Sequence, residues 1–260
     1  MNGPATGDIL WHGLAVAMAL NTLVWMLSLA KRDAGVIDSF WSLGFVLLAW
    51  LWRGEMAADH PRAWLVCGLV TIWGLRLAAH IAWRNRGRGE DPRYTAMRAR
   101  APRTFPWTSL VTVFWLQALL LWLIATSIYL ALRTPGPLTL LDYAGLALWL
   151  FGFLFETVAD AQLARFRNRP ENSGRVMDRG LWRYSRHPNY FGEACLWWGI
   201  GLMAVAGGGW GLAGPALLTF LLLRVSGVTL MDRHLAETRA GFRDYARRTK
   251  AFLPRRPRNS

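Results

Sequence analysis

The stretch RYSRHPNYFGE, residues 183–193, places basic, amide and acidic side chains directly before the apolar segment ACLWWGIGLMAVA. Pro188 suits the first turn of a helix, because the N–H that proline lacks is not needed there. Asn189, Glu193 and Trp197 follow at intervals of four and therefore share one helical face. Since a helix N-terminus offers free N–H donors and a positive dipole end, this stretch predicts a site for a phosphate or another polar group.

A second polar stripe lies in the preceding apolar segment, which reads FLFETVADAQLARFRNRPENSGR. On a helix, Glu156, Asp160 and Arg167 fall within about 40° of each other. Charged groups inside a membrane span are costly and usually mark function. A buried ion pair or a capped helix end is the structural alternative. Two carboxylates and an arginine on one stripe nevertheless favour a ligand site.

Further ionisable residues lie near the ends of the other apolar segments. Arg76, His80 and Arg84 follow at intervals of four in one segment, and Asp38 stands in the opening GVIDSFW of another, where it could also cap a helix. His187 is compatible with a ligand role and equally with a cap or a salt bridge. The arginines just upstream of Pro188 are Arg175, Arg179, Arg183 and Arg186.

The elements that must position these residues are membrane helices. The chain has 260 residues, of which 53% are hydrophobic, and 16 are tryptophan. A bilayer span needs about 20 apolar residues, and its backbone must satisfy its own hydrogen bonds. We identify seven segments, near residues 8–30, 36–52, 63–83, 107–132, 140–164, 189–206 and 210–231. The sequence therefore predicts an all-α integral membrane protein, with residues 1–260 as a single seven-helix domain.

The ends of the chain and its cysteines refine this prediction. The first segment lacks a basic leader, so we expect a retained helix and not a cleaved signal. Cys67 and Cys195 both lie in apolar segments, which argues against a disulfide framework or a Cys-rich metal site. We expect no metal.

The basic residues orient the helices, because Lys and Arg stay on the cytoplasmic side. With the N-terminus outside, the inner segments carry 25 Lys or Arg residues. The outer loops carry only Arg53, Arg62 and Arg133. Seven helices and this asymmetry agree on an outer N-terminus and a cytoplasmic C-terminus.

The formal charge of +14 suits anionic lipid, nucleic acid or a phosphorylated cofactor. No nucleic-acid-binding motif accompanies the charge, so we expect no nucleic acid partner. The polar groups gather at the predicted cytoplasmic ends of the last three helices. We therefore expect a pocket that opens to the cytosol and narrows into the bilayer, where a charged cofactor meets a lipid-soluble substrate.

Three stretches carry a family resemblance: ETVADAQLARFR, GRVMDRGLWRYSRHPNYFGE and GFRDYARRTKAFLPRRP. They resemble the steroid 5α-reductase family in its bacterial branch, from roughly residue 31 to the C-terminus. Sterol Δ14- and Δ7-reductases and isoprenylcysteine carboxyl methyltransferases share parts of the pattern. The resemblance implies NADPH-dependent reduction of an enone, the Δ4-3-keto group of a steroid. It also implies a bacterial inner membrane location with the cofactor site facing the cytoplasm.

The resemblance further implies which residues contact NADPH. Glu156 falls where members often have Asn, and Arg224 lies near a family arginine. The residues that match cofactor-contacting or neighbouring aromatic positions are Glu156, Asp160, Arg167, Arg175, Tyr184, Asn189, Tyr190, Glu193, Trp197, Arg224 and His234.

At the carbonyl end, the family uses a Gln-Glu pair on its second helix and a Tyr on its third. Here the local sequence is VIDSFW, with Asp38 near the position of the Glu. His80 or Tyr94 could replace the Tyr. The predicted catalytic groups are thus Asp38 with His80, or Asp38 with Tyr94. Asp38 could donate a proton only if burial kept its carboxyl neutral.

Two alternatives remain at this point. An isoprenylcysteine-type methyltransferase would use S-adenosylmethionine, which has no phosphate to engage the arginines. A lipid-binding scaffold would use its intramembrane polar residues only to hold helices together. We expect an enzyme, a lipid-soluble enone and the bilayer as partners, and a monomer.

Overall fold

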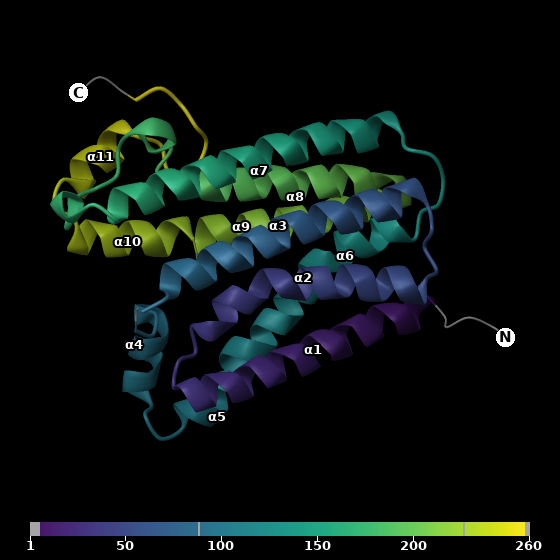
Figure 1. The fold of residues 1–260 in the computed structure, drawn as a ribbon, viewed down its shortest axis with the longest axis horizontal. Coiled ribbons are helices and arrows are strands. Elements are labelled where there is room, and N and C mark those ends of the chain that lie inside the picture. Colours follow the sequence, from purple (N-terminus) through teal and green to yellow (C-terminus); the bar gives the residue numbers. More distant parts are fainter. Residues whose placement is uncertain (1–5, 88, 226, 258–260) are drawn as a thin grey trace. The chain divides into compact units, whose positions relative to one another are not determined.

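The computed structural model describes residues 6–87, 89–225 and 227–257, and all regular structure within these ranges is helical (Figure 1). The all-α prediction is therefore confirmed. Within the described ranges, six helical segments are long and apolar enough to cross a membrane: Gly7–Lys31, Val36–Glu55, Pro61–Asn85, Phe105–Leu132, Leu140–Arg167 and Gly209–Thr238. The remaining segment forms α8 (Pro188–Ala204), which has only 17 residues. The count of seven spans stays a prediction.

The chain divides into two compact units. The first comprises Met1–Leu138 with Ala204–Gly211, and the second comprises Thr139–Met203 with Leu212–Ser260. The predicted catalytic residues all belong to the first unit, and the predicted cofactor residues all belong to the second. The single-domain interpretation stays a prediction.

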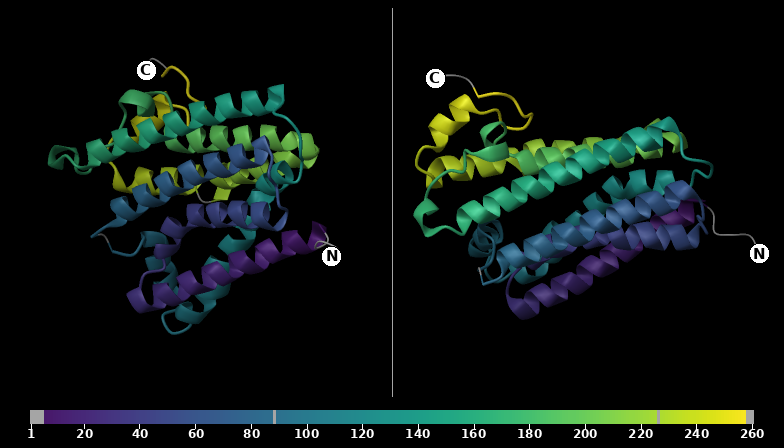
Figure 2. Two further views of the ribbon diagram at one scale, coloured as in Figure 1. Left: turned by 45° about the vertical axis from the view of Figure 1, so that its right-hand side comes forward. Right: turned by 45° about the horizontal axis from the view of Figure 1, so that its top comes forward.

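The first unit is a helical bundle built around α2. It contains α1 (Thr6–Lys31), α2 (Val36–Glu55), α3 (Pro61–Asn85), α4 (Pro92–Arg100), α5 (Phe105–Ser109) and α6 (Leu116–Leu132). A π-helical turn, η1 (Leu110–Trp115), joins α5 to α6. Helix α2 contacts α1, α3 and α6 (Figure 2). The predicted span 107–132 is thus a continuous helical segment with a local change of pitch.

Small residues let the helices of this bundle approach closely. A Cβ on Gly74 of α3 would lie 3.0 Å from the carbonyl oxygen of Ser42 on α2. The Ser42 hydroxyl donates to the Gly74 carbonyl over 2.8 Å. On the other side of α2, Gly44 makes room for the Leu121 side chain of α6. Small residues and hydroxyls of this kind are what membrane helices use to pack, because lipid provides no hydrophobic drive between them.

The C-terminus of α2 predicts a stabilising substitution. Ala57 adopts φ 47° directly after the helix, a conformation in which glycine is the usual residue. Ala57→Gly should raise the free energy of unfolding by about 1 kcal/mol, because it removes the steric cost of a Cβ at positive φ. Thermal unfolding in detergent measures this change. The same substitution at the exposed Ala96, inside α4, should destabilise by about 1 kcal/mol, so equal effects at both sites would contradict the argument.

The second unit contains α7 (Leu140–Arg167), α8, α9 (Ala213–Phe220), α10 (Val228–Thr238) and α11 (Phe242–Arg248). Short 3-10 turns, η2 (Pro170–Asn172) and η3 (Gly180–Arg183), lie between α7 and α8. A second π-helical turn, η6 (Leu221–Val225), follows α9. The last predicted segment, 210–231, is therefore helical but not one regular α-helix.

Glycines bring α7 and α8 into backbone contact. A Cβ on Gly152 would lie 2.5 Å from the carbonyl oxygen of Gly192, and one on Gly145 would lie 2.5 Å from that of Gly199. The pairs are seven residues apart on each helix and run in opposite directions, so the helices are antiparallel. This seam brings the polar end of α7 beside the first turn of α8.

Candidate functional site

The predicted stripes of α7 and α8 meet at the end of the glycine seam. Asn189 Nδ2 donates to Asp160 Oδ1 over 3.2 Å, which joins the two helices. Glu156 and Asp160 are both buried, with 2% and 7% of their surface exposed. Periodicity placed each residue on a face of its own helix, and the structure brings these two faces together.

Asn189 has a polar atom left over at this junction. Its Oδ1 is buried and has no hydrogen-bond partner among the described residues. Leaving a buried acceptor unsatisfied costs about 1–3 kcal/mol, so such an atom in a native structure needs an explanation. A donor group on a bound ligand would satisfy it. The cluster therefore has the chemistry of a site for a polar molecule.

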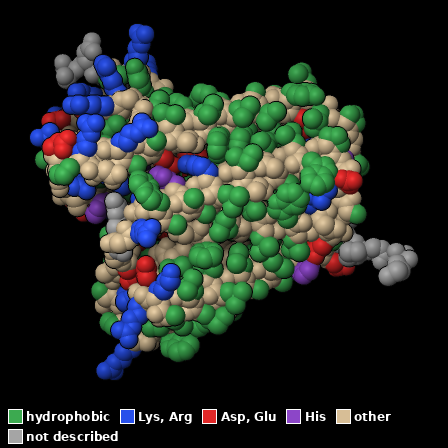
Figure 3. All heavy atoms as spheres, in the orientation of Figure 1, with side chains coloured by type: hydrophobic (Ala, Val, Ile, Leu, Met, Phe, Trp, Pro, Cys, Tyr) green, Lys and Arg blue, Asp and Glu red, His purple; other side chains and the backbone are tan. Residues whose placement is uncertain are grey.

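The basic residues predicted to contact the cofactor lie on the surface of the second unit. Arg167, Arg175, Arg224 and His234 are exposed, and Tyr184 is 40% exposed. In Figure 3, Lys and Arg side chains gather over the end of this unit that carries α11. Arg175, which lies outside the candidate spans, can therefore reach an anionic ligand without first losing much hydration.

The remaining predicted aromatic and acidic residues of α8 are more enclosed. Glu193 is partly buried, and Trp197 is only 1% exposed. The Tyr190 ring stacks on the His187 ring with centroids 5.4 Å apart and planes 3° apart. These residues therefore belong to the packed body of the unit, beside the Asp160–Asn189 junction.

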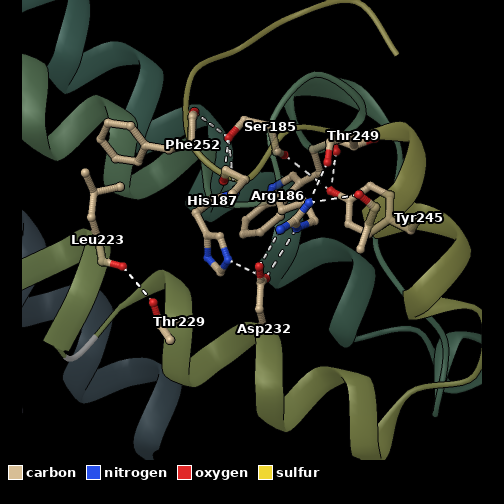
Figure 4. A network of polar contacts seen from close by, with 12 residues as sticks. Ser185, Arg186, His187, Leu223, Thr229, Asp232, Tyr245, Thr249 and Phe252 are labelled. Carbon is tan, nitrogen blue, oxygen red and sulfur yellow. Dashed lines mark hydrogen bonds and ion pairs between the residues drawn. The ribbon is translucent and has the colours of Figure 1, made fainter. Parts of the chain in front are cut away.

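Arg186 and His187 bind a partner that the sequence did not indicate. His187 Nε2 lies 2.9 Å from Asp232 Oδ1, and the Arg186 guanidinium contacts Asp232 Oδ2 at 2.5 Å (Figure 4). Of the roles considered for His187, the structure shows the contact with a carboxylate that the salt-bridge alternative requires. Asp232 is the one acidic residue in the first half of α10. An acid at the end of an apolar segment that faces many arginines is the signal that could have found it.

The same arginine holds the C-terminal segment. Arg186 Nη1 donates to the carbonyl oxygens of Ala246 and Thr249 over 3.1 and 2.6 Å. The buried Tyr245 hydroxyl donates to the carbonyl oxygens of Trp182 and Ser185. Burial raises the pKa of Tyr245, so its hydroxyl keeps the donated proton. Much of RYSRH thus anchors the start of α8.

In the first unit, the structure joins Asp38 to Tyr94. The Tyr94 hydroxyl donates to Asp38 Oδ1 over 3.0 Å, and Arg93 Nη2 donates to Asp38 Oδ2 over 2.7 Å. Burial raises the pKa of Tyr94 most, and the nearby Asp38 carboxylate raises it further. Gln117 Nε2 in turn donates to the Tyr94 oxygen over 3.3 Å. Tyr94 is therefore a buried hydroxyl that keeps its proton and is held from two sides.

The turn before α4 determines where Tyr94 lies. Asp91 caps the helix by accepting from the Arg93 backbone N–H over 2.9 Å. Burial opposes its ionisation, but hydrogen bonds from Arg93 hold the pKa of Asp91 below its ordinary value. Glu90 accepts from the Ala34 N–H and from Arg98, which ties α4 to the turn between α1 and α2. An ordered N-terminus of α4 thus places Tyr94 beside the start of α2.

His80, the other group considered with Asp38, is partly buried in α3. Its ring centroid lies 6.2 Å from that of Trp83 on the same helix. Gln117 was not among the predicted residues, since it lies in a helix with no other charged or amide side chain. An isolated amide in an apolar span was the available signal. Among the described residues, no group of three or more His, Cys, Asp or Glu could hold a metal ion.

Known proteins resemble this chain to different extents. An uncharacterized protein of Schizosaccharomyces pombe is 24% identical over 278 residues, covering 94% of this chain and 79% of that protein. The 3-oxo-5-alpha-steroid 4-dehydrogenase 1 of Bos taurus is 32% identical over 110 residues, and that of Rattus norvegicus is 30% identical over 110 residues. Each of these two matches covers 42% of this chain and 40% of the enzyme. No solved structure matches the chain.

These matches support a distant relationship to steroid 5α-reductases over part of the chain. A match to a family pattern covers more of the chain than the two dehydrogenase matches do. It begins within α1 and ends directly after α11, so it includes every candidate site residue. The pattern is that of the family described as "Protein of unknown function (DUF1295)". Because it matches residues 24–249, the chain belongs to the DUF1295 family.

Proposed function

We propose that this protein is a membrane-embedded reductase that uses NADPH to reduce the carbon–carbon double bond of a lipid-soluble enone. A 3-oxo-Δ4-steroid is the proposed model substrate. The observation that carries the proposal is the buried Tyr94 hydroxyl, hydrogen-bonded to Asp38 and holding its proton. Reduction of an enone needs such a donor at the carbonyl oxygen, where negative charge develops.

The cofactor residues lie in the second unit. Their support is the buried Asn189 Oδ1 beside Asp160, which has no hydrogen-bond partner in the part of the chain that the structure describes, together with exposed arginines that suit phosphate. When bound, the reduced nicotinamide supplies the hydride. Asp160 and Asn189 hold polar groups of the cofactor, and Arg167 and Arg175 bind its phosphates.

Tyr94 donates its proton toward the substrate carbonyl oxygen. Asp38 and Arg93 orient the tyrosine before the substrate arrives, which spares reorganisation during the reaction. A single positioned acid of this kind contributes about 10²–10⁴-fold to the rate. Tyr94 itself packs in an apolar cluster with Ile37 and Phe114, which limits the access of water to its hydroxyl.

The proposed topology is seven spans, an outer N-terminus and a cytoplasmic C-terminus, in a bacterial inner membrane. Support comes from the exposed arginines that follow α7 and from those of α11 and the C-terminal segment. The cofactor residues then face the cytosol, where NADPH is available.

An assay of the purified full chain in detergent tests the reaction. NADPH and a Δ4-3-ketosteroid should yield NADPH oxidation that depends on the enone, with a product heavier by two hydrogens. The matching 5α-dihydro-steroid, which lacks the double bond, is the control substrate. If S-adenosylmethionine raised the thermal unfolding temperature of the protein and NADPH did not, the methyltransferase alternative would be supported instead.

The arginines yield a sharper test of the cofactor assignment. Arg167→Lys and Arg175→Lys should each raise the Kd for NADPH about tenfold, because lysine cannot make the bidentate contact of a guanidinium with phosphate. Calorimetry or nicotinamide fluorescence measures the affinity. Arg243→Lys, an equally exposed change on α11, is the matched control and should leave the Kd unaltered. Unaltered affinity in the first two variants would remove these residues from the site.

A further inference from the structure

Gln117 makes a contact that the proposed reaction has not yet used. Its Nε2 donates to the Tyr94 oxygen, while the Tyr94 O–H donates to Asp38. Gln117 is the one amide side chain of α6, a helix that is otherwise rich in leucine. A polar side chain is costly in an apolar span, so its presence requires a specific partner. Tyr94 is that partner.

The backbone just before Gln117 helps to determine the direction of its side chain. The π-helical turn Leu110–Trp115 ends two residues before Gln117. One extra residue in a helical turn rotates all later side chains by about 100° relative to a regular α-helix. Val113 and Phe114 of this turn pack in the same buried cluster as Tyr94. The turn therefore packs against Tyr94 and also determines the direction of the Gln117 side chain that follows it.

A phenol oxygen has one O–H and two acceptor positions. With its O–H directed at Asp38 and one acceptor position taken by Gln117, the Tyr94 hydroxyl has a defined orientation. In the proposed reaction the Tyr94 O–H bond breaks and an O–H bond to the substrate oxygen forms. The electron pair stays on Tyr94, which becomes a phenolate. The enol that results is then protonated by water at its α-carbon, and its O–H proton returns to Tyr94, which leaves the saturated ketone and hydroxide.

We infer that Gln117 is a positioning residue, which orients the Tyr94 hydroxyl and stabilises the phenolate left after proton donation. This inference rests on the proposed function. The Gln117 N–H strengthens its hydrogen bond as negative charge appears on the Tyr94 oxygen. It acts in the transition state more than in the ground state, so it affects kcat more than KM.

Kinetics of two variants test the role. Gln117→Leu keeps the approximate shape but cannot donate, and should lower kcat for the enone about 10- to 100-fold with little change in KM. Gln117→Glu can donate only when protonated, so its kcat should rise as the pH falls, relative to wild type. Thr126→Val, in the same helix but bonded to its own backbone, should behave as wild type.

A second readout does not depend on activity. The chain has 6 tyrosines, so labelling with ¹³Cζ-tyrosine yields few resonances, and Tyr94→Phe identifies that of Tyr94. Gln117→Leu should shift the Tyr94 resonance and leave the others in place. If it does not shift, the contact is absent and the inference falls. If it shifts while kcat and its pH profile stay as in wild type, the positioning role falls.

The two proposals fail in different ways. Wild-type protein that reduces no enone overturns the proposed function, and with it the catalytic role of Gln117, whereas the resonance still decides the contact. Equal losses in Gln117→Leu and Thr126→Val would mean that any polar change in α6 impairs the enzyme, which also overturns the inference. Loss in Gln117→Leu with recovery of Gln117→Glu at low pH supports it.

Discussion

Tyr94→Phe should lower kcat for enone reduction by about 10²–10⁴-fold, the usual contribution of a single positioned acid. The substitution removes the O–H that donates to Asp38 and leaves the ring in its buried cluster with Ile37 and Phe105. The affinity for NADPH should stay the same, because Tyr94 is not one of the proposed cofactor residues. Single-turnover rates and the Kd for NADPH, measured on the same preparation, separate these two effects.

The matched control is Tyr143→Phe, which removes the hydroxyl of a tyrosine that is 57% exposed. It should leave kcat as in wild type. If Tyr94→Phe reduces the enone at the wild-type rate, Tyr94 is not the proton donor. His80→Gln then becomes the next variant to measure, since His80 is the other predicted partner of Asp38.

Asp232→Asn should lower the free energy of unfolding by about 3 kcal/mol, because it leaves the Arg186 guanidinium without its carboxylate. Asp232 receives both the Arg186 guanidinium and His187, which is only 3% exposed. An asparagine would direct an NH₂ group at one of these donors. Arg186 also holds the backbone of α11, so the C-terminal segment should loosen. Denaturant unfolding in detergent measures the stability, and trypsin cleavage after Lys250 or Arg255 measures the loosening.

Asp244→Asn is the control for this second variant. Asp244 pairs with Arg247 on the surface, where the two side chains are 64% and 76% exposed. Exposed pairs contribute about 0–1 kcal/mol, so stability and trypsin cleavage should barely change. Wild-type protease resistance in Asp232→Asn would show that the carboxylate does not hold the C-terminal segment.

The two polar networks differ in what their groups have available. In the second unit, protein partners bind both oxygens of Asp232 and each of the three nitrogens of Arg186. In the first unit, the Tyr94 proton faces one carboxylate and can be redirected to a substrate oxygen. The Asp232 network of the second unit therefore suits anchoring, and the Tyr94 network of the first unit suits chemistry.

The amino-acid sequence alone determined that this chain is helical and apolar enough for a membrane. Long apolar runs must form helices in lipid because their backbone groups have no other partners. Helical periodicity also determined that Glu156 and Asp160 share a face, since that depends only on spacing. These features are local, so they survive without knowledge of the fold.

Only the tertiary structure decided which faces meet. Asp38 and Tyr94 are far apart in sequence, and so are His187 and Asp232. Periodicity predicts the direction of a side chain on its own helix but not the helix opposite. The contact of Gln117 further depends on a π-helical turn, which shifts the phase of a helix without any clear signature in its residues. The site is therefore a product of helix packing and pitch, both of which arise from contacts between distant residues.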